Sequence, residues 1–136
     1  MTVPAPLVGV SAIVVDDDRI LLVRRGRAPA SGRWAPPGGR VEHGEAAVEA
    51  VTRELREETG LEGVCGRSLG WTEHIDDEAH IVLLAFEVTL LGDDQPAAGD
   101  DAAEVAWVDL HAVAELDLVV GVAEFLHDQG IISTFT

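Results

Sequence analysis

The sequence has no lysine, no tyrosine and a single cysteine, Cys65. One cysteine cannot form a disulfide within the chain, so a hydrophobic core must stabilise the fold, and a cytoplasmic location is expected. No uninterrupted apolar run reaches the roughly 20 residues that span a bilayer. The apolar N-terminus also lacks the positively charged region of a signal peptide. These absences argue against a secreted or membrane protein.

Positive charge is also scarce, because 9 basic residues stand against 25 acidic ones, which gives a net charge of −16. Such a surface repels nucleic-acid backbones and anionic membranes, so neither is an expected partner. All nine basic residues are arginine, and six of them lie within residues 19–40. Those six are either solvated surface residues or contacts for substrate phosphate, which the guanidinium fork suits.

The length of 136 residues and the hydrophobic content of 47% predict a single domain, residues 1–136, with its own core. Apolar, β-branched runs predict strands at residues 7–15, 19–25, 64–75, 80–91 and 104–108. The first two strands are predicted to form a hairpin around Asp16–Asp18. Helices are predicted at residues 45–59, where Gly60 ends the helix, and at residues 119–129. This mixture indicates an α/β (α+β) fold with a mixed central sheet between helices.

The helix of residues 45–59 carries three carboxylates at positions i, i+3 and i+4: Glu54, Glu57 and Glu58. Residues at this spacing are neighbours on one helical face, so their charges repel one another. Either water screens such a cluster or a cation neutralises it. Three hard oxygen ligands suit Mg²⁺, which commonly bridges to substrate phosphates. A backbone carbonyl of the Gly38–Gly39 turn, just before the helix, is a candidate further ligand.

The other faces of this helix follow from the same geometry. The predicted core stripe consists of Val48, Val51 and Leu55. The small side chains of Ala47 and Ala50 are expected to leave room above the carboxylates. Glu49 is expected to pair with Arg53 at the i, i+4 spacing.

The residues around the carboxylates have a further pattern in common with a known family. They contain a glycine, five residues, a glutamate, seven residues, and then Arg-Glu-aliphatic-x-Glu-Glu-x-Gly-aliphatic. The matching positions are Gly39, Glu45, Arg53-Glu54-Leu55, Glu57-Glu58 and Gly60-Leu61. Every defined position resembles the box of the Nudix hydrolases, and the small chain looks most similar to the MutT-like group. The resemblance implies an α/β/α sandwich that hydrolyses a nucleoside diphosphate linked to another moiety, with Mg²⁺ or Mn²⁺.

The resemblance also implies roles for individual residues. The expected metal ligands are Glu54, Glu57, Glu58 and the backbone carbonyl of Gly38. Arg53 is expected to orient a glutamate by ion pairing, and Glu45 to support the site near the start of the helix.

The general base differs between members of the family, and two positions stay open. One is Glu54 on the helix. The other is an acid on a distal loop, for which the candidates are Asp100, Asp101 and Glu104.

The expected substrate is a small nucleotide. The missing tyrosine excludes the marker typical of dinucleoside polyphosphate hydrolases, and the proline of many ADP-ribose hydrolases has no counterpart here. A nucleoside triphosphate or oxidised (d)NTP, cleaved to monophosphate and pyrophosphate, is therefore expected, with ADP-ribose or a nucleotide sugar as the alternative. A domain that senses nucleotides without catalysis is a lesser alternative. A homodimer is possible through the apolar residues 7–15 and 131–135.

Overall fold

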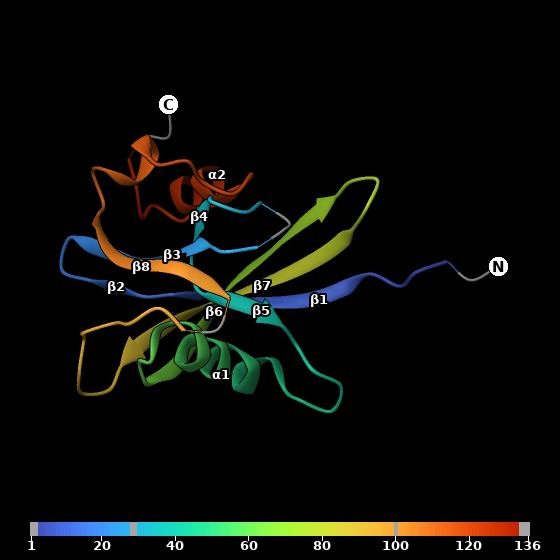
Figure 1. The fold of residues 1–136 in the computed structure, drawn as a ribbon, viewed down its shortest axis with the longest axis horizontal. Coiled ribbons are helices and arrows are strands. Elements are labelled where there is room, and N and C mark those ends of the chain that lie inside the picture. Colours follow the sequence, from blue (N-terminus) through green and yellow to red (C-terminus); the bar gives the residue numbers. More distant parts are fainter. Residues whose placement is uncertain (1–2, 28–29, 100, 134–136) are drawn as a thin grey trace.

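The computed structural model describes residues 3–27, 30–99 and 101–133. Its strands form two four-stranded sheets, with helix α1 on one side and helix α2 on the other (Figure 1). Sheet A has the order β5 (Gly38–Arg40), β1 (Leu7–Ile13), β7 (His80–Leu90), β6 (Gly63–Ile75). Sheet B is built on β3 (Arg19–Arg25), which pairs with β2 (Val15–Asp16), β4 (Trp34–Ala35) and β8 (Ala102–Asp109).

The helical elements are α1 (Ala47–Thr59), the 3-10 turn η1 (Val113–Glu115) and α2 (Val122–Asp128). Strands β1 and β7 run parallel, whereas β1 pairs with β5 and β6 pairs with β7 in the antiparallel sense. The predicted mixed α/β fold between helices is confirmed, although its strands divide between two sheets. None of the helices in the described ranges is long and apolar enough to cross a membrane.

The predicted hairpin of residues 7–15 and 19–25 is wrong for most of its length. Only Val15–Asp16 pairs with β3, while β1 lies in sheet A between β5 and β7. Residues of β1 belong to two hydrophobic clusters, because Val10 packs on the α1 side and Ile13 packs on the α2 side. A strand that is buried on both faces is apolar throughout and pairs well inside a sheet.

The apolar terminal segments contribute mainly to this core. Residues 10–14 of the first segment are at most 6% exposed, and Ile132 of the second is 5% exposed. Leu7, Val8 and Val15 of the first segment are 39%, 43% and 41% exposed, so the homodimer expected through residues 7–15 stays a prediction. Residues 134 and 135 of the second segment lie outside the described ranges.

Helix α1 begins two residues later than predicted and ends as predicted before Gly60. Gly60 has a left-handed φ of 76°, and its N–H donates to the carbonyl of Arg56 at 2.9 Å. At the other end, the N–H of Ala46 donates to Glu49 Oε1 at 3.0 Å. Because the Glu49 carboxylate serves the start of the helix, its predicted pairing with Arg53 is wrong.

The buried face of α1 is rotated from the predicted one. Val51 and Leu55 are fully buried, as predicted, but Val48 is 49% exposed and Ala50 is fully buried. Ala50 therefore packs in the core and cannot leave room above the carboxylates. The helix packs against β1, β5, β6 and β7, and Val48 lies outside this contact face.

Candidate active site

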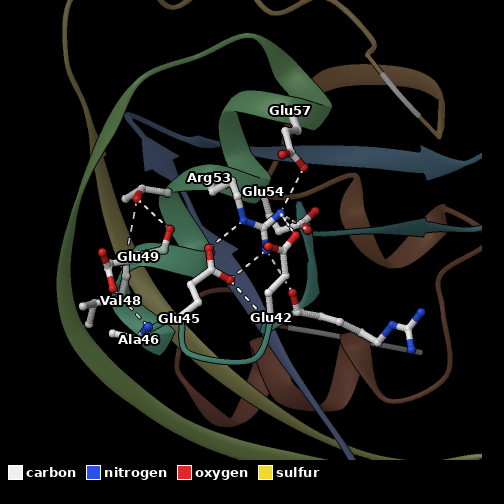
Figure 2. Close-up of polar contacts among 10 residues, drawn as sticks. Glu42, Glu45, Ala46, Val48, Glu49, Arg53, Glu54 and Glu57 are labelled. Atoms are coloured by element: carbon white, nitrogen blue, oxygen red, sulfur yellow. Dashed lines mark hydrogen bonds and ion pairs between the residues drawn. The ribbon is translucent and has the colours of Figure 1, made fainter.

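Arg53 on α1 holds three glutamates (Figure 2). Its Nε and Nη2 donate to the two carboxylate oxygens of Glu45 at 2.7 and 3.0 Å. Its Nη1 donates to Glu54 Oε1 at 2.8 Å and to Glu57 Oε2 at 3.0 Å. The planar guanidinium fork can serve several carboxylates at fixed angles, which a lysine ammonium cannot do. Arg53 therefore fixes the direction of Glu45 and of two of the three predicted carboxylate ligands, Glu54 and Glu57.

The loop before α1 brings Glu45 to this arginine. Glu45 accepts a hydrogen bond from the N–H of Glu42 at 3.0 Å, which closes the turn in front of the helix. Arg53 Nη2 also donates to the carbonyl of Arg40 at 3.0 Å. One side chain thus connects the end of β5, the loop and the helix, so the glycine pair in β5 is held against the carboxylates.

The two glycines of β5 allow a close approach between strand and helix. A Cβ on Gly39 would overlap the carboxylate of Glu54, and a Cβ on Gly38 would overlap the carbonyl of Val10. The N–H of Gly38 donates to Glu58 Oε1 at 2.8 Å. The structure thus brings Gly38 to Glu58 through its amide, while the carbonyl of Gly38 as a metal ligand stays a prediction.

The carboxylates differ in their electrostatic environment. The hydrogen bond from Arg53 lowers the pKa of Glu45 to about 2. Burial raises the pKa of Glu54, against the lowering effect of Arg53. Burial also raises the pKa of Glu58 to about 7, and the hydrogen bond from Gly38 only partly offsets it. The pKa of Arg53 is raised, chiefly by its bonds to Glu45. The ionised form of Glu58 is therefore the one that a nearby positive charge would stabilise most.

The site fits a divalent cation in its donor chemistry. Among the described residues, no group of three or more Asp, Glu, His or Cys side chains is arranged so that it could hold a metal ion. Two of the carboxylates, Glu54 and Glu57, accept hydrogen bonds from Arg53 instead. The carboxylates are nevertheless hard oxygen donors on one rigid helix, and the lack of a side chain at Gly39 lets the Glu54 carboxylate lie against β5.

The distal acids Asp101 and Glu104 each have an arginine partner of their own. Asp101 forms an ion pair with Arg27, and Glu104 Oε1 accepts from Arg24 Nε at 3.2 Å. Neither acid shares a hydrogen bond with the helix carboxylates in the described residues. Burial is the largest cause of the raised pKa of Glu58, and the negative charges of Glu54 and, to a smaller extent, Asp101 add to it. Asp101 therefore lies within electrostatic range of Glu58. Asp100 lies outside the described residues.

Arg40 is one of the six arginines of residues 19–40 that the sequence offered either as solvated surface or as contacts for substrate phosphate. It pairs with Gly9 of β1, so its side chain lies on the face of sheet A opposite to the Gly39 position beside Glu54. Its carbonyl is held by Arg53. Because successive side chains of a strand point to opposite faces, the sequence of β5 could have predicted that Arg40 and Gly39 face opposite sides of the sheet.

The chain belongs to the Nudix family, because the model of the NUDIX domain matches residues 5–129. The resemblance inferred from the box is thereby confirmed. Members of this family generally need divalent cations.

Two relatives carry different names. An ADP-ribose pyrophosphatase of Methanocaldococcus jannaschii is 39% identical over 113 residues, 82% of this chain and 66% of that protein. A putative 8-oxo-dGTP diphosphatase 2 of Mycobacterium tuberculosis is 36% identical over 115 residues, 81% of this chain and 78% of that protein. The chain thus spans just under two thirds of the first relative. A solved MutT protein from Methanosarcina mazei has a TM-score of 0.83 and 25% identity, covering 95% of this chain and 96% of the other.

Proposed function

We propose that this chain hydrolyses a nucleoside diphosphate linked to another moiety, in a reaction that depends on Mg²⁺ or Mn²⁺. The first candidate substrate is a (d)NTP or oxidised (d)NTP, cleaved to the monophosphate and pyrophosphate. The observation that supports this most is the arrangement around Arg53, which holds Glu54 and Glu57 on one helix, with the Glu54 carboxylate packed against Gly39 where a Cβ would not fit.

The carboxylates of Glu54, Glu57 and Glu58, with the carbonyl of Gly38, would hold the cation. A divalent cation there would polarise phosphoryl oxygens and make a water more acidic. Arg53 keeps Glu54 oriented, and Glu45 holds Arg53 from the other side. In this proposal Glu54 accepts the proton of the attacking water, because it is both buried and fixed by Arg53.

Arginine would receive the remaining phosphate charge. Arg40 is exposed and has a rigid backbone, since Arg53 holds its carbonyl. A guanidinium in this position suits a phosphate of a substrate that lies over the edge of β5. This resolves part of the conflict between a chain of net charge −16 and a polyanionic substrate.

ADP-ribose is the second candidate, and a specific observation favours it. The relative at 39% identity is named an ADP-ribose pyrophosphatase. Both reactions break a diphosphate bridge, so the residues above would act alike, and the groups that contact the rest of the nucleotide would decide between them.

A panel of substrates with Mg²⁺ tests this proposal. The panel holds the four dNTPs, 8-oxo-dGTP, ADP-ribose and a dinucleoside polyphosphate, and phosphate release is coupled to a pyrophosphatase or phosphatase. We expect turnover of a triphosphate with release of pyrophosphate, abolished by EDTA. Turnover restricted to ADP-ribose would favour the second candidate. Tight nucleotide binding without turnover of any compound would favour a sensor and contradict the proposal.

A further inference from the structure

Two of the predicted ligands lie on the weakest turn of helix α1. Glu57 and Glu58 belong to its last turn, where backbone carbonyls have no partner within the helix. The negative end of the helix dipole is at this terminus, so it disfavours carboxylates there. A turn loaded in this way would fray unless other groups of the chain hold it.

The segment of residues 94–99, between β7 and β8, supplies the missing partners. The N–H of Gly99 donates to the carbonyl of Glu58 at 3.0 Å, and the N–H of Ala97 donates to the carbonyl of Thr59 at 2.9 Å. A Cβ on Gly99 would overlap the carbonyl of Glu57. The segment therefore lies directly against the backbone of the two residues, and only a glycine permits this approach.

The far end of the segment is anchored on sheet B. Arg19 of β3 donates to Asp94 Oδ2 at 2.8 Å, and its guanidinium lies 4.3 Å from the ring centroid of Trp107 in β8. The indole N–H of Trp107 donates to the carbonyl of Asp94 at 2.8 Å. Asp94 is thus held by its side chain and by its backbone. The chain runs from this anchor past the end of α1 (Figure 1).

We infer that the 94–99 segment positions Glu57 and Glu58 for the cation, with Gly99 and Ala97 as positioning residues and Arg19, Asp94 and Trp107 as their remote anchor. This inference rests on the proposed function, because it takes Glu57 and Glu58 as ligands. In this inference the segment acts through the backbone of the helix, to which Gly99 and Ala97 donate. It acts by keeping the last turn of α1 helical, so that both carboxylates stay on the face that Glu54 occupies.

Binding of Mn²⁺ to the full chain without substrate, followed by the electron paramagnetic resonance of free Mn²⁺, tests the inference. Gly99→Ala forces the segment off the helix, and Ala97→Pro removes the N–H that reaches Thr59. Each change should weaken Mn²⁺ binding about tenfold or more. At saturating Mg²⁺ the kcat should return to within several-fold of the unchanged chain, because the carboxylates themselves remain. Ala98→Ser, an exposed neighbour, should bind Mn²⁺ normally.

The anchor has its own variant, which also serves if the two loop variants do not fold. Asp94→Asn keeps the backbone bond from Trp107 and loses only the ion pair, and its side chain is 42% exposed, so the fold should survive. It should weaken Mn²⁺ binding more than Asp77→Asn, which removes the same charge from the β6–β7 turn. Equal Mn²⁺ affinity in Asp94→Asn and Asp77→Asn would overturn the anchor.

The ligand assignment is checked in the same titration. If Glu57→Gln loses Mn²⁺ binding while Gly99→Ala and Ala97→Pro keep it, the positioning role is wrong and the proposed function stands. If Glu57→Gln binds Mn²⁺ as tightly as the unchanged chain, the ligand assignment itself is wrong.

Discussion

Two regions of the molecule combine acids with arginine in different proportions. Around Arg53, three carboxylates share one guanidinium, and a fourth, Glu42, lies 3.8 Å away. Where the end of β3 meets the start of β8, the ratio is one to one in the pairs Arg24–Glu104 and Arg27–Asp101.

The burial of the two regions also differs. The side chains of Arg53, Glu45 and Glu54 are 15–16% exposed, whereas those of Arg24 and Glu104 are 37% and 54% exposed. In the second region charge cancels in water and contributes little. In the first, uncompensated negative charge is held where solvent screens it poorly. This excess of negative charge supports the proposed cation site at the helix, and the loop has no such excess.

The strongest way to break this comparison is to neutralise one acid in each region. Glu54→Gln should lower kcat by about 10²- to 10⁴-fold, because the proton acceptor is lost. Glu104→Gln should lower it by less than about fivefold, since it only breaks an exposed ion pair. Steady-state rates on the best substrate of the panel measure both. The reverse order would move the general base to the distal acids.

The next test replaces one arginine of each region by lysine. Arg53→Lys cannot serve three carboxylates at once, so activity should fall about 10- to 100-fold, as for residues that orient metal ligands. Arg24→Lys is the matched change in the exposed region and should have less than about a fivefold effect. Similar losses in both variants would show that the dense cluster has no special role.

The free energy of unfolding of the metal-free chain should depend on pH through Glu58. The pKa of Glu58 rises from 4.5 in the unfolded chain to about 7 in the fold. Its contribution to stability is therefore fully present below pH 4.5 and is lost as the pH rises through 7. Glu58→Gln cannot ionise and keeps an acceptor for Gly38.

In EDTA, the gain in unfolding free energy from Glu58→Gln should thus grow by about 1–3 kcal/mol from pH 5 to pH 8. Thermal unfolding followed by circular dichroism measures this difference. An equal effect at both pH values would show that Glu58 is ionised in the fold throughout this range.

The smallest expected effect concerns Arg40. Arg40→Gln should raise KM about fivefold with little change in kcat, because one exposed phosphate contact is lost. Arg67→Gln on β6, which breaks an exposed pair with Glu87 on β7, is the control and should leave KM unchanged. An unchanged KM in Arg40→Gln would remove Arg40 from the substrate site.

Local rules were sufficient for much of the chain. The spacing of Glu54, Glu57 and Glu58 placed them on one helix, and Gly60 ended that helix because glycine takes a left-handed φ easily. The order of strands and helices also predicted the mixed fold. These features depend on residues close together in the sequence, so periodicity and capping are enough to find them.

The partners of the charged residues depended on contacts distant in the sequence. Glu49 had the correct spacing for Arg53, but Glu45 came closer because the loop turned it back over the helix. Similarly, β1 did not pair with β3 over its length, because its two apolar faces required a place inside sheet A.

The sequence by itself determined the helix, its three carboxylates and the family, because these follow from the order of residues within one short stretch. Only the tertiary structure decided how each carboxylate is held. The approach of β5 put Gly39 against Glu54 and the N–H of Gly38 on Glu58, and the return of residues 94–99 completed the last turn of α1. Burial and hydrogen bonding at these contacts, which no local pattern encodes, make the pKa of Glu58 differ so widely from that of Glu45.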